Sequence, residues 1–224
     1  VYVNGNNKTI FSNAIHTSLE KNISVTSGTS KSVQFVENTI KKAKIKFEIE
    51  RVKFEKSSEV YNAMQTVLAW TTIYDPNNNR IINPVSRTFS PDWVLFGWDT
   101  YFATYMLSLN NKQLAYANAI AITKEITAKG FIPNNSQYGH KSEDRSEPQV
   151  GSIVVREIYR KYEEKWFLKE VYNELLSWNR WRAANRDVDG YLVHGTDPYD
   201  YGDSKSRSAT LSGKMKAAKW ESGM

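Results

Sequence analysis

The chain has 224 residues, of which 40% are hydrophobic and 13% aromatic, and it carries a formal net charge of +6 and no cysteine. This composition indicates a globular chain rather than a disordered one, long enough for one substantial core or two modest ones. It excludes a disulfide framework and a cysteine-ligated metal site, and no apolar run reaches the ~18 residues of a membrane span.

The net positive charge does not by itself indicate a nucleic-acid-binding protein. Lys and Arg are interleaved with Glu at helical spacing in two segments, residues 41–56 (KKAKIKFEIERVKFEK) and residues 159–170 (YRKYEEKWFLKE). Solvated helix faces have this pattern. We therefore expect neither a nucleic acid nor a membrane among the partners of this chain.

Residues 1–37 differ in composition from the rest of the chain. Three short β-branched stretches, VYVNG, NISVTSG and SVQFV, are separated by Gly, Ser and Asn and predict strands. Three short strands cannot bury a hydrophobic face alone. We therefore expect either the last part of a β-domain or an arm that packs on the main body.

Residues 38–56 carry two competing patterns. Ile45 and Phe47 begin a strand-like alternation, whereas Ile40 and Phe54 fit a helical stripe together with Phe47. The segment is rich in Lys and Glu and contains no Gly or Pro, which favours a helix. We predict a linker helix over this segment.

From residue 57 onward a helical apolar pattern repeats, and Pro148 is expected in the first turn of one of the helices. The apolar stripes lie within residues 60–71, 98–109, 115–126, 153–158 and 167–178. Long polar loops over residues 75–97, 130–147 and 187–213 alternate with short connections. This order predicts a toroid of antiparallel helical hairpins in which loops at one end build a site; an ordinary helical bundle with long loops remains the alternative.

The segment SRTFSPDWVLFGWDTYF, residues 86–102, carries the first candidate site residues. Aromatic faces such as that of Trp98 stack on the apolar faces of sugar rings, and a carboxylate such as Asp99 accepts hydrogen bonds from two hydroxyls. A second interpretation stays open, because a carboxylate at a helix start also caps the helix or interacts with its dipole.

Three further segments concentrate polar and aromatic residues: residues 130–152, residues 189–208 and the final KWESGM. His194 lies in the second of them, where we expect a surface or hydrogen-bonded histidine. The three histidines are not at metal-ligand spacing and no phosphate-binding or zinc motif is present, so we expect neither a metal nor a cofactor. A glycosidase needs two carboxylates across the scissile bond, but spacing along the chain does not select the pair.

Together these segments resemble glycoside hydrolase family 63, the processing α-glucosidase family and its bacterial relatives, which is akin to the family 37 trehalases. The resemblance covers roughly residues 57–224. The residues that carry it are PVSRTF, FGWDTYFATYMLSLNNKQLAYANAI, GFIPN, DRSEPQVGS, YEEKWFLKEVYNELLSWNRW and AAKWESGM.

The resemblance implies a mainly α fold, an (α/α)6 toroid usually preceded by a β-sandwich, and an inverting mechanism on α-glucosidic linkages. In the family, the ESGM-like motif continues into the general acid Asp, and the general base Glu lies much further on. We therefore expect residues 1–37 to be a β-rich remnant and residues 57–224 to be the first half of the catalytic domain, truncated at Met224. The missing second half is then a partner, and this chain alone is expected to be inactive.

The resemblance also assigns sugar-binding residues, while it places no catalytic residue within the chain. Trp98 and Asp99 match the WD pair expected to hold the sugar where the bond is cleaved. One position departs from the pattern, because relatives usually read RSQPPVGS where this chain has Glu147 and Gln149. The other matching positions are Phe96, Asn134, Arg145, Trp220, Glu221 and Gly223.

The leading hypothesis is therefore the N-terminal part of an inverting, exo-acting glycoside hydrolase that cleaves α-glucosidic linkages of oligosaccharides. A non-catalytic carbohydrate-binding or interaction protein on the same helical scaffold is the alternative, and another toroid enzyme such as a polysaccharide lyase is a third hypothesis. The compartment is open, with a bacterial periplasmic or secreted location favoured over the cytoplasm.

Overall fold

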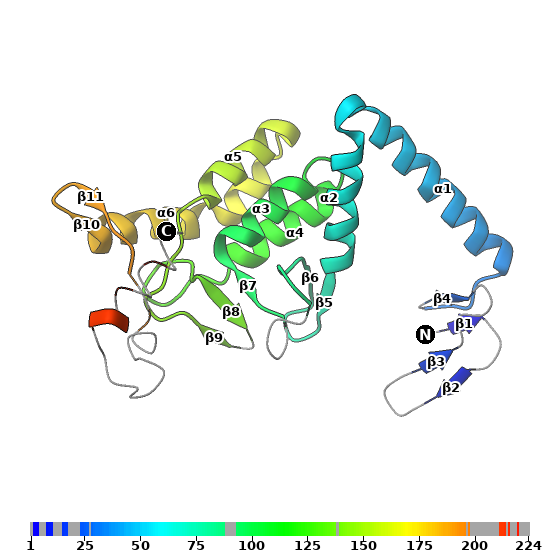
Figure 1. Cartoon of the computed structure of the whole chain (residues 1–224), viewed down its shortest axis with the longest axis horizontal. Helices are drawn as coiled ribbons and strands as arrows, with labels where there is room; N and C mark the ends of the chain where they lie inside the picture. The colour runs from blue at the N-terminus through cyan, green and yellow to red at the C-terminus, as the bar shows by residue number, and fades with distance from the viewer. Residues whose placement is uncertain are drawn as a thin grey trace. The chain divides into compact units, whose positions relative to one another are not determined.

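The computed structural model divides the chain into two compact units, Val1–Asn62 and Ala63–Met224, which are described separately (Figure 1). The structure describes residues 2–4, 8–10, 15–17, 23–26, 28–87, 93–137, 139–195, 197, 211–213, 215 and 219.

The first unit begins with two short antiparallel strand pairs. Strand β1 (Tyr2–Asn4) pairs with β4 (Ser24–Thr26), and β2 (Lys8–Ile10) pairs with β3 (Ile15–Thr17). The first two expected strands are thereby confirmed as β1 and β4. The strands β2 and β3 were not predicted, because their short runs lack a clear alternation of apolar and polar residues.

The third expected strand, SVQFV, is wrong, because this stretch begins helix α1 (Val33–Val52). The Ser32 side chain accepts a hydrogen bond from the Phe35 backbone N–H at 3.2 Å, as an N-cap residue does. This cap and the helix-forming Lys and Glu that follow outweigh the β propensity of two valines. No residue of α1 is buried, and a 3-10 turn (Glu55–Ser57) follows the helix.

The second unit is built from helices that pack as antiparallel neighbours. Helix α3 lies against α4, α5 lies against α6, and the two pairs are in contact through α3 with α5 and α4 with α6 (Figure 1). The mainly helical fold expected from the sequence is confirmed, with helical hairpins as in an α/α toroid. The helices are α3 (Gly97–Leu107), α4 (Lys112–Thr123), α5 (Gly151–Tyr162) and α6 (Lys165–Arg186), together with the larger part of α2 (Ser58–Thr71), which begins in the first unit.

The long loops between these helices contain short antiparallel strands. Strands β7, β8 and β9 form a three-stranded sheet in that order, while the other four form two hairpins, β5–β6 and β10–β11. The sheet is important for the site because β7 runs directly into α3. The strands are β5 (Ile73–Asp75), β6 (Arg80–Ile82), β7 (Leu95–Phe96), β8 (Asn135–Gln137), β9 (His140–Lys141), β10 (Asp187–Val188) and β11 (Tyr191–Leu192).

Aromatic side chains fill the space between the helices. The buried rings of Tyr101 and Trp178 stack with centroids 6.3 Å apart, joining α3 to α6. A Cβ on Gly151 would lie 2.6 Å from the Tyr101 ring, so only glycine fits where α5 crosses this ring. Helix α5 begins at this glycine, and Pro148 lies before the helix rather than in its first turn, which corrects the expectation.

A buried pair of asparagines connects the end of β6 to α4. The Asn83 backbone N–H donates to Asn118 Oδ1 at 2.6 Å, and Asn118 Nδ2 donates back to Asn83 Oδ1 at 3.0 Å. Asn83 Nδ2 in turn donates to the Leu68 carbonyl of α2 at 2.7 Å. Both side chains are almost fully buried, so the three segments are linked by hydrogen bonds that water cannot replace.

We predict that Asn118→Ala lowers the free energy of unfolding by about 2–4 kcal/mol, because it leaves buried donor and acceptor groups of Asn83 without partners. Chemical denaturation of the protein measures this change. Asn173→Ala, at an exposed position of α6, is the matched control and should stay within about 0.5 kcal/mol of the wild type. Equal stability of the two variants would contradict the structural role of the pair.

Candidate active site

The candidate site lies around the N-terminus of α3, which directly follows strand β7 of the three-stranded sheet. The backbone of Phe96 is extended and pairs with Asn135 of β8. The Gly97 backbone N–H donates to the Asn134 carbonyl at 2.8 Å. The helix start is therefore fixed by the neighbouring strand, and no side chain of its own N-cap residue accepts a bond from the first turn.

A carboxylate from a distant loop supplies that acceptor. Glu147 Oε2 accepts a hydrogen bond from the Trp98 backbone N–H at 2.7 Å, across 49 residues of sequence. Its other oxygen, Oε1, accepts from Asn134 Nδ2 at 2.5 Å. The Glu147 side chain is 6% exposed, and a Cβ on Gly97 would lie 2.8 Å from Oε2. Close approach of the carboxylate thus requires glycine at position 97.

The loop that carries Glu147 is held from two directions. The Asn134 backbone N–H donates to the Arg145 carbonyl at 2.9 Å. On the other side, Arg182 Nη1 of α6 donates to the Glu147 carbonyl at 3.2 Å. The loop is therefore connected both to the strand that starts the site and to the C-terminal part of α6.

A buried aspartate, Asp197, accepts hydrogen bonds from the backbone of the same loop, two and three residues before Glu147. Asp197 Oδ1 accepts the backbone N–H groups of Asp144 at 2.7 Å and Arg145 at 3.0 Å, and its side chain is fully buried. Arg186 forms an ion pair with Asp144 at 3.0 Å. None of Asp197, Arg182 and Arg186 was predicted as a site residue from the sequence. The four-residue spacing of the two arginines, which places them on one face of α6, is the sequence pattern that indicates their proximity.

His194 lies beside these arginines and is half-buried. Burial lowers the pKa of its imidazole, and the positive charges of Arg182 and Arg186 lower this pKa further. Its Nδ1 has no hydrogen-bond partner among the described residues, and the expectation of a surface or hydrogen-bonded histidine stays a prediction. A neutral imidazole at pH 7 follows from this environment.

Asp99 stands in the first turn of α3, next to Trp98. Burial raises the pKa of the Asp99 carboxyl, although hydrogen bonds from its own backbone N–H and from the Trp98 side chain act in the opposite direction. The Trp98 ring remains partly exposed and lies 6.4 Å from the Phe102 ring, centroid to centroid. A partly exposed indole and a carboxylate are thus presented from one helical turn.

The structure brings together six of the predicted sugar-binding residues at this helix start, although their sugar contacts stay predictions. These residues are Phe96, Trp98, Asp99, Asn134, Arg145 and Glu147. The remaining three, Trp220, Glu221 and Gly223, lie outside the described residues.

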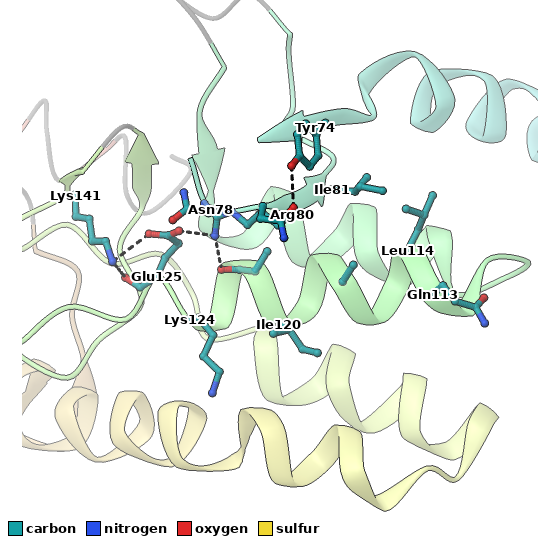
Figure 2. Close-up of a pocket in the computed structure, with 13 residues that line it drawn as sticks. Tyr74, Asn78, Arg80, Ile81, Gln113, Leu114, Ile120, Lys124, Glu125 and Lys141 are labelled. Carbon is teal, nitrogen blue, oxygen red and sulfur yellow. Dashed lines mark hydrogen bonds and ion pairs between the residues drawn. The ribbon is translucent and has the colours of Figure 1, made fainter. Parts of the chain in front are cut away.

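A groove of about 840 Å³ lies elsewhere, between the β5–β6 hairpin and α4, and none of the predicted sugar-binding residues lines it (Figure 2). Glu125 at its end accepts from Ser136 at 2.6 Å and pairs with Arg80 at 2.7 Å and Lys141 at 3.0 Å. Burial alone would raise the pKa of Glu125, but these three partners lower it below the usual range. The cluster therefore ties β8 and β9 to the end of α4.

Within the described ranges, no group of three or more His, Cys, Asp or Glu side chains is placed to hold a metal ion. No helix in the same part of the chain combines the length and hydrophobicity needed to cross a membrane.

Comparison with known proteins gives one result for the site region. A family model described as "Mannosylglycerate hydrolase MGH1-like glycoside hydrolase domain" matches residues 93–223, more than half of the chain. This range begins just before β7 and includes the whole arrangement around the start of α3. No curated protein matches the chain.

We predict that Asp99→Asn has a higher melting temperature than the wild type at pH 7. Because the folded-state pKa of Asp99 is raised, its contribution to stability is fully present below the unfolded-state pKa and is lost as pH rises through the folded-state pKa. The uncharged Asn side chain avoids this loss of stability. The difference in melting temperature between Asp99→Asn and the wild type should therefore shrink as the pH falls toward 4. Thermal unfolding between pH 4 and pH 8 tests this, with Asp187→Asn, at an exposed carboxylate, as the control. A lower melting temperature for Asp99→Asn at pH 7 would instead favour the helix-capping interpretation.

Proposed function

The chain belongs to the mannosylglycerate hydrolase MGH1-like glycoside hydrolase domain family, and from this membership we propose that it forms the sugar-binding part of an inverting, exo-acting enzyme that cleaves α-linked oligosaccharides. The resemblance to glycoside hydrolases expected from the sequence is confirmed by this membership, which makes the chain part of a hydrolase with a carbohydrate substrate. The linkage, the exo mode and the inverting stereochemistry belong to the proposal.

The observation that carries the proposal is the presentation of Trp98 and Asp99 from the anchored first turn of α3. The apolar face of a sugar ring packs on an indole, while a carboxylate accepts bonds from two neighbouring hydroxyls. Such charge-assisted bonds are stronger than neutral ones. The fixed spacing between ring and carboxylate selects a sugar in one orientation, as positioning for catalysis requires.

The proposed mechanism assigns binding to this chain and proton transfer to residues further along the full-length protein. Trp98, Asp99, Asn134 and Arg145 hold the sugar whose bond is cleaved. In this proposal a general acid Asp, expected from the family resemblance to follow the ESGM-like motif, protonates the leaving oxygen. A more distant Glu removes a proton from the water that attacks the opposite face of the sugar. Two such carboxyls in an inverting enzyme stand about 6.5–9.5 Å apart, which leaves room for the water.

We expect the full-length protein to release a single terminal sugar from α-linked glucosides, with inversion at the anomeric carbon. A panel of α-glucosides and α-mannosides, with mannosylglycerate included because of the family's name, identifies the sugar, and proton NMR during the first turnovers identifies the anomer released. The 224 residues alone should show no turnover, because the proposed acid and base are absent and each contributes about 10²–10⁴-fold.

Two results of this panel would count against the proposal. Release of the retained anomer would contradict the inverting mechanism. Saccharide binding by the full-length protein without any turnover would support the alternative, a non-catalytic carbohydrate-binding protein on the same scaffold.

In the full-length protein, we predict that Asp99→Asn lowers kcat/KM by about ten- to a hundredfold. The substitution keeps the size of the side chain but removes charge-assisted bonds worth about 1.5–3 kcal/mol each, and ~1.4 kcal/mol corresponds to a factor of ten. Steady-state kinetics on the panel's best substrate measure this loss. Asp187→Asn is the matched control and should keep wild-type kcat/KM. Unchanged kcat/KM in Asp99→Asn would remove Asp99 from the sugar site.

A further inference from the structure

We propose that Glu147 is a positioning residue that holds Trp98 and Asp99 in the orientation required for the sugar, rather than a residue that contacts the sugar. Its effect on hydrolysis rests on the proposed function above, whereas its effect on the helix start does not. The proposal replaces the sugar-binding role expected for Glu147 from the family resemblance.

The start of α3 needs an acceptor that its N-cap residue does not provide. The first N–H groups of a helix have no partner within the helix and are usually satisfied by a Ser, Thr, Asp or Asn side chain at the N-cap. Here the N-cap residue is Phe96, which has no such side chain. Glu147 accepts from the Trp98 N–H instead, and its negative charge lies at the positive end of the helix dipole.

The Glu147 side chain accepts a hydrogen bond at each of its two oxygens, and only a carboxylate can accept at both. Asn135 Nδ2 donates to Asn134 Oδ1 at 3.2 Å, and Asn134 Nδ2 donates to Glu147 Oε1 at 2.5 Å. The Trp98 N–H donates to the other oxygen. Trp98 and Asn134 therefore both donate to Glu147, and a carboxylate is an acceptor at both oxygens, whereas the amide of Gln places a donor at one of them.

Rotation of the Asn134 amide alone does not restore all of the bonds in a Gln variant. The rotated amide would offer an oxygen to Gln, but its NH₂ group would then face the donating Asn135 NH₂. Related sequences have Gln at position 147, and the hydrogen bonds give a physical reason for the difference. Asn135 donates to Asn134, Asn134 donates to Glu147, and the carboxylate is the acceptor at the end of this series.

The burial of Glu147 indicates that it acts through the helix. The side chain is 6% exposed and lies against the backbone of Gly97, where a Cβ would approach its Oε2 to 2.8 Å. Arg182 holds its carbonyl from behind. The carboxylate is thus enclosed by the helix start, the strand end and α6, while Trp98 and Asp99 are more exposed.

The first arm of the test measures the helix start without reference to activity. Hydrogen exchange is followed by mass spectrometry on the full-length protein. Backbone amides in the first turn of α3 should exchange at least about tenfold faster in Glu147→Gln than in the wild type, because a charge-assisted hydrogen bond to this turn is lost. The matched control is Glu157→Gln, a partly exposed carboxylate on α5, which should leave this exchange unchanged. Wild-type exchange in Glu147→Gln would overturn the proposal.

The second arm measures kcat/KM in a double-mutant cycle with Asp99→Asn. We expect Glu147→Gln to lower kcat/KM about tenfold in the wild-type background but less than about twofold in the Asp99→Asn background, because residues that act through one another are not additive. Equal losses in both backgrounds would mean an independent contact with the sugar and would overturn the positioning role. Loss of thermal stability with unchanged kcat/KM would also overturn it.

A second variant keeps the test decisive if Glu147→Gln does not fold. Gly97→Ala adds one methyl group at a helical position where Ala is intrinsically favoured by about 1 kcal/mol over Gly. It displaces the carboxylate from the Trp98 N–H, so faster exchange in the first turn and the same non-additivity are expected. If the wild type hydrolyses no glycoside, the proposed function fails, and the exchange arm alone then decides whether Glu147 anchors the helix.

Discussion

The N-cap residue of α3, Phe96, has no side chain that can accept the backbone N–H groups of the first turn, and the rest of the site follows from how this need is met. A carboxylate 49 residues away accepts one of these groups, which forces the loop around residues 143–147 to lie against the end of β7. That loop must then be fixed itself, because a buried carboxylate with a mobile backbone would lose its hydrogen bonds. Asp197 from one side and Arg182 from the other provide the necessary contacts.

The helical layer makes this arrangement possible by packing bulky rings against positions that tolerate only glycine. Tyr101 stacks on Trp178 and fills the space over Gly151, so the starts of α3 and α5 approach each other closely. Such packing leaves little freedom to shift one helix relative to another. The candidate site residues on the first turn of α3 are therefore held in position by this aromatic core.

Charged groups have two distinct uses in this unit. Glu125 has its charge balanced by Arg80 and Lys141, which ties strands to a helix and keeps the pKa of Glu125 low. Asp99 is in the opposite situation, because burial raises its pKa without a described cation to compensate. A carboxylate held at such a cost to stability is typical of a functional position rather than of a structural one. The difference separates the structural cluster beside the groove from the candidate sugar site.

The sequence by itself determined the helices and pointed to the segments of the candidate site. Periodic apolar stripes fixed α2 to α6, because a helix that buries one face must repeat at 3.6 residues, and the WD pair marked the candidate site. Sequence patterns predicted secondary structure less well in two places. At Ser32 a helix cap competed with the strand propensity of the residues that follow, and at Lys8–Ile10 the strand is too short to show an alternation of apolar and polar residues. Only the tertiary structure decided the partners of Glu147 and the burial of Asp197. Their hydrogen bonds connect residues about 50 positions apart, and no periodicity along the chain specifies which distant donor a carboxylate will meet.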